Sequence, residues 1–86
     1  MEDFEVWEFV KMRIDEAMRS LAKTMDLVHS AIAEIVTEGS EEERKFYGNE
    51  LIDIDVRLAE IWDRLDVFSM LVKKKIERLE KPKKKV

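Results

Sequence analysis

The sequence predicts an all-α protein, an antiparallel helical hairpin that dimerises into a four-helix bundle. Three observations predict it: two long stretches carry apolar residues at helical spacing, one glycine-serine pair separates them, and the apolar residues exceed what one hairpin can bury. The 86 residues include only two glycines and one proline, too few turn residues for a sheet. They include no cysteine, so the chain has no thiol for a disulfide or a cysteine-ligated zinc site. We expect a single domain over residues 1–81.

The first helix is expected over residues 3–38. Its apolar stripe advances by alternating steps of three and four residues, the spacing that keeps side chains on one face of an α-helix. The stripe consists of Trp7, Val10, Ile14, Ala17, Leu21, Thr24, Val28, Ala31 and Ile35. A flank formed by Phe4, Met18, Met25 and Ile32 widens the stripe on one side.

The turn is expected at Gly39 and Ser40. Glycine suits the left-handed conformation that commonly follows a helix end, and Ser40 with Glu43 has the spacing of a capping box. The second helix therefore starts at residue 41.

This second helix is expected over residues 41–80, with an apolar stripe of its own. The stripe consists of Leu51, Ile54, Leu58, Ile61, Leu65, Phe68 and Val72, with Trp62 and Ile76 beside it. Because proline cannot continue the hydrogen bonding of a helix, we expect the helix to end before Pro82 and residues 82–86 to form a basic, mobile tail. Asn49 could cap a separate helix after Gly48; one helix through both residues is favoured, since a single glycine costs only about 1 kcal/mol.

Folding the two helices together pairs small residues with large ones. Ala17 faces Leu65, Thr24 faces Leu58 and Ala31 faces Leu51, the size alternation of a packed seam. The apolar residues outside this seam need a second layer, which a second copy of the chain supplies most simply. The expected dimer interface comprises Phe4, Met18, Met25, Ile32, Trp62 and Ile76.

Charge is distributed unevenly along the chain. Residues 1–39 and 40–71 each carry a net charge of −5, whereas residues 72–86 carry +6, so that the total is −4. Such a basic end can contact the phosphates of DNA or RNA, or it can balance the helix dipole and the acidic N-terminal residues of its own hairpin. The candidate nucleic-acid or partner contacts are Lys73, Lys74, Lys75, Arg78, Lys81, Lys83, Lys84 and Lys85.

No catalytic, cofactor-binding or metal-ligating residue is predicted, although one pattern supplies side chains of the metal-binding type. The pairs Asp26-x-x-His29 and Glu50-x-x-Asp53 offer the carboxylate and imidazole ligands from which dimeric bundles build metal sites. A surface ion pair between His29 and Asp53 is the simpler interpretation.

The leading functional hypothesis is a small non-catalytic adaptor or regulatory protein, a homodimeric bundle that binds another macromolecule, with an unidentified protein as partner. The alternatives are a nucleic-acid-binding regulator that uses the basic C-terminal end and, third, a small helical enzyme with a carboxylate metal site. The absence of glutamine and the single asparagine favour a thermophilic source. Because no apolar run approaches the roughly 18 residues that span a bilayer, we expect a cytoplasmic protein with no membrane contact.

Overall fold

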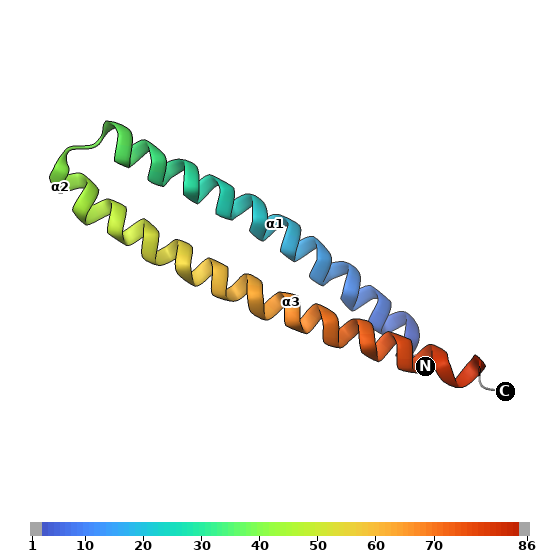
Figure 1. Cartoon of the computed structure of the whole chain (residues 1–86). Helices are drawn as coiled ribbons and strands as arrows, with labels where there is room; N and C mark the ends of the chain where they lie inside the picture. The colour runs from blue at the N-terminus through green and yellow to red at the C-terminus, as the bar shows by residue number, and fades with distance from the viewer. Residues whose placement is uncertain (1–2, 85–86) are drawn as a thin grey trace.

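The structure, a computed structural model, describes the backbone of residues 3–84 and the side chains of residues 4–80. It is a hairpin of two long helices, α1 (Asp3–Glu38) and α3 (Asn49–Lys84), with overall dimensions of 68 × 18 × 15 Å. The helices run antiparallel, and α1 begins at the end of the rod where α3 finishes (Figure 1). The all-α hairpin predicted from the sequence is confirmed.

The connection begins with the capping box expected at Ser40. The Ser40 hydroxyl accepts a hydrogen bond from the Glu43 N–H at 3.2 Å, and Glu43 Oε1 accepts one from the Ser40 N–H at 2.8 Å. These bonds satisfy two of the donors that a helix start leaves unpaired. They set the start of the short helix α2 (Glu41–Glu43).

The role expected for Gly39 is wrong. Its φ lies outside the left-handed region, so no unusual conformation requires a glycine here. The requirement is steric, because a Cβ on Gly39 would lie 2.6 Å from the carbonyl oxygen of Ile35. That oxygen accepts a hydrogen bond from the Gly39 N–H at 2.8 Å, which holds the two groups close together.

Arg44 closes the end of α1, a role that the sequence analysis missed. Its guanidinium Nη1 donates hydrogen bonds to the carbonyl oxygens of Gly39 at 2.7 Å and Val36 at 3.2 Å. The last carbonyls of a helix lack partners within the helix, and a cation there is also favoured by the helix dipole. Arg44 therefore joins the end of α1 to the start of the second helical segment.

A π-helical turn, η1 (Arg44–Gly48), carries the chain from α2 into α3 without a break. The helix thus passes through Gly48 and Asn49, as favoured from the sequence. Gly48 is buried, and a Cβ at this position would lie 3.9 Å from Cγ2 of Ile35. A methyl group would therefore meet Ile35 at an ordinary contact distance, so the packing of α1 here does not require a glycine.

The other end of α3 differs from the prediction. The helix continues through Pro82 to Lys84, whereas the sequence analysis ended it at residue 80. The φ of proline is fixed near −65°, a helical value, so Pro82 is compatible with the helix in φ although it cannot donate a backbone hydrogen bond. The prediction of a mobile tail falls largely outside the described residues, which exclude residues 85–86 and the side chains of residues 81–84.

The contact between the two helices is a seam with a strict repeat of seven residues, whose positions are half-buried or buried. The α1 positions are Phe4, Trp7, Lys11, Ile14, Met18, Leu21, Met25, Val28, Ile32 and Ile35. The α3 positions are Gly48, Leu51, Asp55, Leu58, Trp62, Leu65, Ser69, Val72, Ile76 and Leu79. In antiparallel order this sets Ile35 opposite Gly48, in agreement with their close approach. The alternation of three and four residues is that of an antiparallel coiled coil.

Half of the seam predicted from the sequence is wrong. Ala17, Thr24 and Ala31 are exposed, and three residues of the stripe predicted on α3 are 42 to 48% exposed. Those α3 residues are Ile54, Ile61 and Phe68. Larger side chains take their places in the seam, which buries more apolar area.

The six residues expected at a dimer interface lie in this intrachain seam. Each of them is half-buried, and each occupies one of the positions of the seven-residue repeat. They are Phe4, Met18, Met25, Ile32, Trp62 and Ile76. Their contact with a second copy stays a prediction, while the surface that the hairpin leaves open consists mainly of other residues.

Candidate interaction surfaces

One side of the hairpin presents two parallel columns of uncharged residues, which we call the apolar face. The side chains of its α1 column are small, and those of its α3 column are large. The face consists of Val10, Ala17, Thr24 and Ala31 on α1 and of Ile54, Ile61 and Phe68 on α3. Both columns flank the seam at intervals of seven residues, so each continues along the length of the rod.

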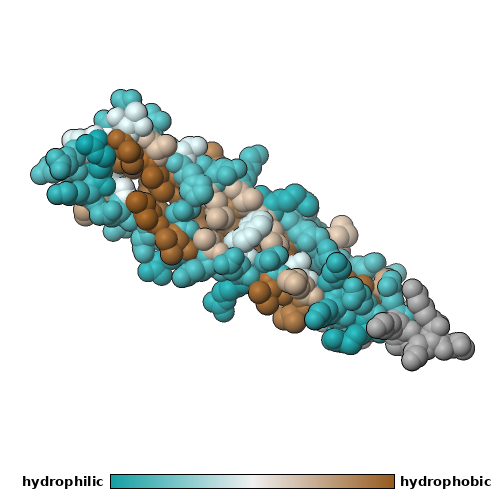
Figure 2. Space-filling view, viewed as in Figure 1, coloured by the Kyte–Doolittle hydropathy of each residue, from teal (hydrophilic) through white to brown (hydrophobic). Residues whose placement is uncertain are grey.

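Contacts at the two ends of the rod place both columns on the same side of the seam. Tyr47, one heptad before Ile54, lines a groove with Glu34, Ile35 and Glu38, and Glu38 is one heptad beyond Ala31. At the other end, Lys75, one heptad beyond Phe68, places its Nζ 5.9 Å from the ring centre of Trp7. Figure 2 shows hydrophobic side chains reaching the surface in patches along the rod, with hydrophilic ones between them.

The opposite side of the seam is the charged face. It carries Glu8, Asp15 and His29 on α1 and Asp66 and Lys73 on α3. A groove that crosses the hairpin here is lined by charged groups of both helices, with Lys11 and Glu77 among them. Lys11 lies at a seam position, and its Nζ reaches Asp15 Oδ2 at 2.9 Å while its alkyl chain stays in the seam.

His29 and Asp55 meet at the edge of this face. Nε2 of His29 lies 2.8 Å from Oδ1 of Asp55, and the Asp55 side chain is 25% exposed. Oδ1 itself is buried and lacks a partner with hydrogen-bond alignment. The predicted pair of His29 with Asp53 is not formed. Asp53 instead accepts a hydrogen bond from Arg57 Nε at 3.0 Å, which raises the pKa of Arg57.

The ligands of the metal hypothesis do not converge. His29 faces Asp55, and Asp53 is engaged by Arg57 on its own helix. Over residues 4–80, no group of three or more histidine, aspartate or glutamate side chains is arranged to hold a metal ion. The hypothesis of a carboxylate metal site therefore gains no support from the geometry.

The basic end divides into engaged and free side chains. Lys75 is half-buried over Trp7, whereas Lys73, Lys74 and Arg78 are exposed. Among residues 4–80, none of these three forms an ion pair. The expected balance with the acidic N-terminal residues stays a prediction, because the side chains of Glu2 and Asp3 lie outside the described residues. The side chains of Lys81, Lys83, Lys84 and Lys85 lie outside the described residues.

The connection presents a pair of exposed aromatic rings that the sequence analysis did not single out. Phe46 is 64% exposed and Tyr47 57% exposed, and their ring centres lie 4.9 Å apart in an edge-to-face arrangement. Both belong to η1. Large aromatic side chains in water at the tip of a rod are typical of contact points for other proteins.

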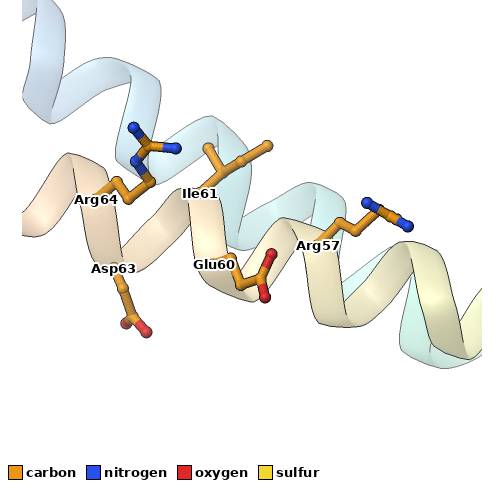
Figure 3. A pocket seen from close by; sticks show the side chains of 5 residues that line it. All are labelled: Arg57, Glu60, Ile61, Asp63 and Arg64. Carbon is orange, nitrogen blue, oxygen red and sulfur yellow. The ribbon is translucent and has the colours of Figure 1, made fainter.

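A further groove runs along α3 alone and does not enclose a site. It is lined by Arg57, Glu60, Ile61, Asp63 and Arg64. Figure 3 shows these side chains spread along the helix, with Arg57 and Arg64 on one side of the ribbon and Asp63 on the other. Without convergence on one point, they do not form the preorganised cluster that catalysis needs.

None of the described helices has a stretch long and apolar enough to cross a membrane. No protein-family model matches the chain, and the searches of curated proteins and of solved structures likewise returned no match.

Proposed function

We propose that the protein is a non-catalytic interaction module, a homodimeric helical bundle that binds another macromolecule. One observation carries the proposal: the hairpin leaves far more apolar surface in water than a stable single chain tolerates. Val72 is the one large apolar side chain that is fully buried among the described residues, and fifteen are more than two fifths exposed. Single chains rarely expose apolar surface on this scale.

The accessible area supports the same conclusion. The chain exposes 6953 Å², whereas a compact monomer of this mass exposes about 5300 Å². The excess of about 1600 Å² is within the range that each chain of an obligate dimer buries. The radius of gyration of 19.4 Å, against about 12 Å for a compact domain of this length, has the same origin.

The oligomeric state tests the dimer. Sedimentation velocity at micromolar concentration is expected to give twice the monomer mass of 10.2 kDa. A single species of 10.2 kDa across that range would contradict the proposal.

Binding to another protein is tested at the exposed tip. Proteins retained by the immobilised wild type are expected to be lost with Phe46→Ser, because exposed aromatic rings are frequent anchors of protein contacts. Phe9→Ser, the same substitution at an exposed phenylalanine far from the tip, is the control. Equal retention by both variants would exclude the tip as the contact.

The free cations of the basic end favour a second function, the binding of nucleic acid. Lys73, Lys74 and Arg78 are exposed and unpaired among the described residues, as phosphate contacts require. Fluorescence anisotropy with duplex DNA and single-stranded RNA, over a series of salt concentrations, tests this function. Replacing all three residues by glutamate is expected to abolish binding, whereas the same change at Arg19, Lys23 and Arg64 is not. Absence of binding by the wild type at low salt would exclude the function.

A further inference from the structure

We propose that the apolar face is the surface that binds the second copy, with the two hairpins stacked face to face and their connections at the same end. In this arrangement α1 of one chain lies against α3 of its partner. The inference rests on the proposed homodimer and specifies the surface and the orientation of the two copies.

The absence of charge selects the apolar face over the charged face. Between Val10 and Ala31 and between Ile54 and Phe68, no column position of the apolar face carries a charge. The equivalent columns on the other side of the seam carry Glu8, Asp15 and His29 on α1 and Asp66 on α3. Burying those groups against a second copy would require partners for each of them, whereas the apolar face has no such cost.

Residue size selects the orientation. The α1 column presents Ala17, Thr24 and Ala31, and the α3 column presents two isoleucines and a phenylalanine. A two-fold axis along the rod sets the small column of each chain beside the large column of the other, with Thr24 within about one turn of Ile61 of the partner. Each large side chain then enters the space that a small one leaves, as in well-packed cores.

The opposite orientation packs less evenly. With the two-fold axis across the rod, α1 would lie on α1 and α3 on α3, so that small residues meet small ones and large residues meet large ones. The two pairs of helices would then need different separations on one rigid face. The rim charges, Arg13 and Glu34 on α1 and Arg57 and Arg64 on α3, are all exposed, and exposed ion pairs contribute too little to reverse this preference.

A matched pair of variants tests the surface. Ile61 and Ile52 are both isoleucines of α3, both 48% exposed, and they lie on opposite sides of the seam. In sedimentation velocity, Ile61→Glu is expected to shift the species to the monomer mass, whereas Ile52→Glu stays a dimer. Circular dichroism checks that both variants remain helical. A dimer that survives Ile61→Glu, or that Ile52→Glu dissociates, would overturn the choice of face.

Cross-linking tests the orientation, and the chain contains no cysteine that would interfere. Thr24→Cys and Ile61→Cys proteins are mixed, unfolded, refolded together and treated with a bismaleimide that spans about 8 Å, close to the separation of neighbouring helices. Mass spectrometry is expected to find the mixed product, since Thr24 and Ile61 of the partner are neighbours. Either variant alone is expected to cross-link at least tenfold less, because identical residues lie diagonally, about 14 Å apart for neighbours spaced at about 10 Å.

The outcomes separate the two proposals. A wild type that sediments as a monomer contradicts the proposed function and the inference with it. A dimer in which Thr24→Cys and Ile61→Cys each cross-link to themselves, without the mixed product, overturns the inferred orientation and leaves the dimer standing.

Discussion

The carbonyl oxygen of Ile35 lies 2.8 Å from the amide nitrogen of Gly39, and only 2.6 Å from the place where a Cβ on that glycine would sit. The hydrogen bond between the two residues ends α1, and the same closeness excludes a side chain. Gly48, the other glycine, has no such neighbour, since its Cβ would meet Cγ2 of Ile35 at 3.9 Å.

The two glycines are therefore expected to respond oppositely to alanine. Gly39→Ala forces the backbone apart and is expected to destabilise the protein by about 1 to 3 kcal/mol. Gly48→Ala adds a methyl group at an ordinary contact distance in a helical segment and is expected to stabilise by up to about 1 kcal/mol. Thermal unfolding followed by circular dichroism measures both, and equal losses of stability would contradict the steric explanation.

The contacts of Arg44 give a second prediction. Arg44→Ala removes both hydrogen bonds to the carbonyls that end α1 and is expected to cost about 1 to 2 kcal/mol, or roughly 4 to 15 °C in Tm. Lys45→Ala, the neighbouring cation without a hydrogen bond to those carbonyls, is the control and should change Tm by much less. If the two variants have the same Tm, the cap formed by Arg44 does not contribute to stability.

Leu58 tests the seam. It is half-buried opposite Met25, so Leu58→Asp places a carboxylate among apolar side chains and is expected to cost several kcal/mol. Val67→Asp makes a similar change at a position that is 57% exposed on the outside of α3. Urea unfolding should show a large loss for Leu58→Asp and a change within roughly 0.5 kcal/mol for Val67→Asp. A Leu58→Asp protein of unchanged stability would show that the register of the seam is wrong.

Asp55, at its position in the seam, is expected to lower the free energy of unfolding of the protein. Its Oδ1 is buried and has His29 Nε2 at 2.8 Å without a well-aligned hydrogen bond, so desolvation is only partly offset. Asp55→Leu is expected to raise the free energy of unfolding by about 1 kcal/mol or more, because a leucine fits the apolar seam. Asp53→Leu, at an exposed position two residues away, removes only the surface pair with Arg57 and should bring no gain. A loss of stability with Asp55→Leu would mean that the ion pair outweighs its desolvation.

The sequence predicted the helices better than the contact between them. Residues 3–38, the break at Gly39 and the capping box follow from local chemistry and could be predicted from the chain alone. The seam could not, because α1 offers two tracks that share Trp7 and Ile14. One continues through Val10 and Ala17, the other through Lys11 and Met18.

The track through Lys11 includes a charge, and its α3 counterpart includes Asp55 and Ser69, polar residues that are costly in a seam unless they have partners. Three-dimensional packing makes these residues acceptable. The ammonium of Lys11 reaches Asp15 at the edge of the seam, and Asp55 meets His29. A seam that contains Met18 and Trp62 buries more apolar area than a seam with alanine at those positions. This difference arises only when the two helices pack together, so neither helix reveals it alone. The roles of Arg44 and of η1 likewise depend on how the connection folds.

The π-helical turn Arg44–Gly48 sets the rotation of α3 about its own axis, and with it the side chains that α3 brings to the seam. A π turn accommodates one residue more than a regular α-helix needs, so the connection stores a single surplus residue between Ser40 and the first seam position of α3. Deleting that residue would turn α3 by about 100° relative to Ser40 and Arg44, more than the roughly 50° that separates the two tracks. The length of the connection therefore determines which face of α3 packs against α1. A one-residue insertion or deletion there, with the residues of both long helices unchanged, would change which side chains lie in the seam and which remain exposed to a partner.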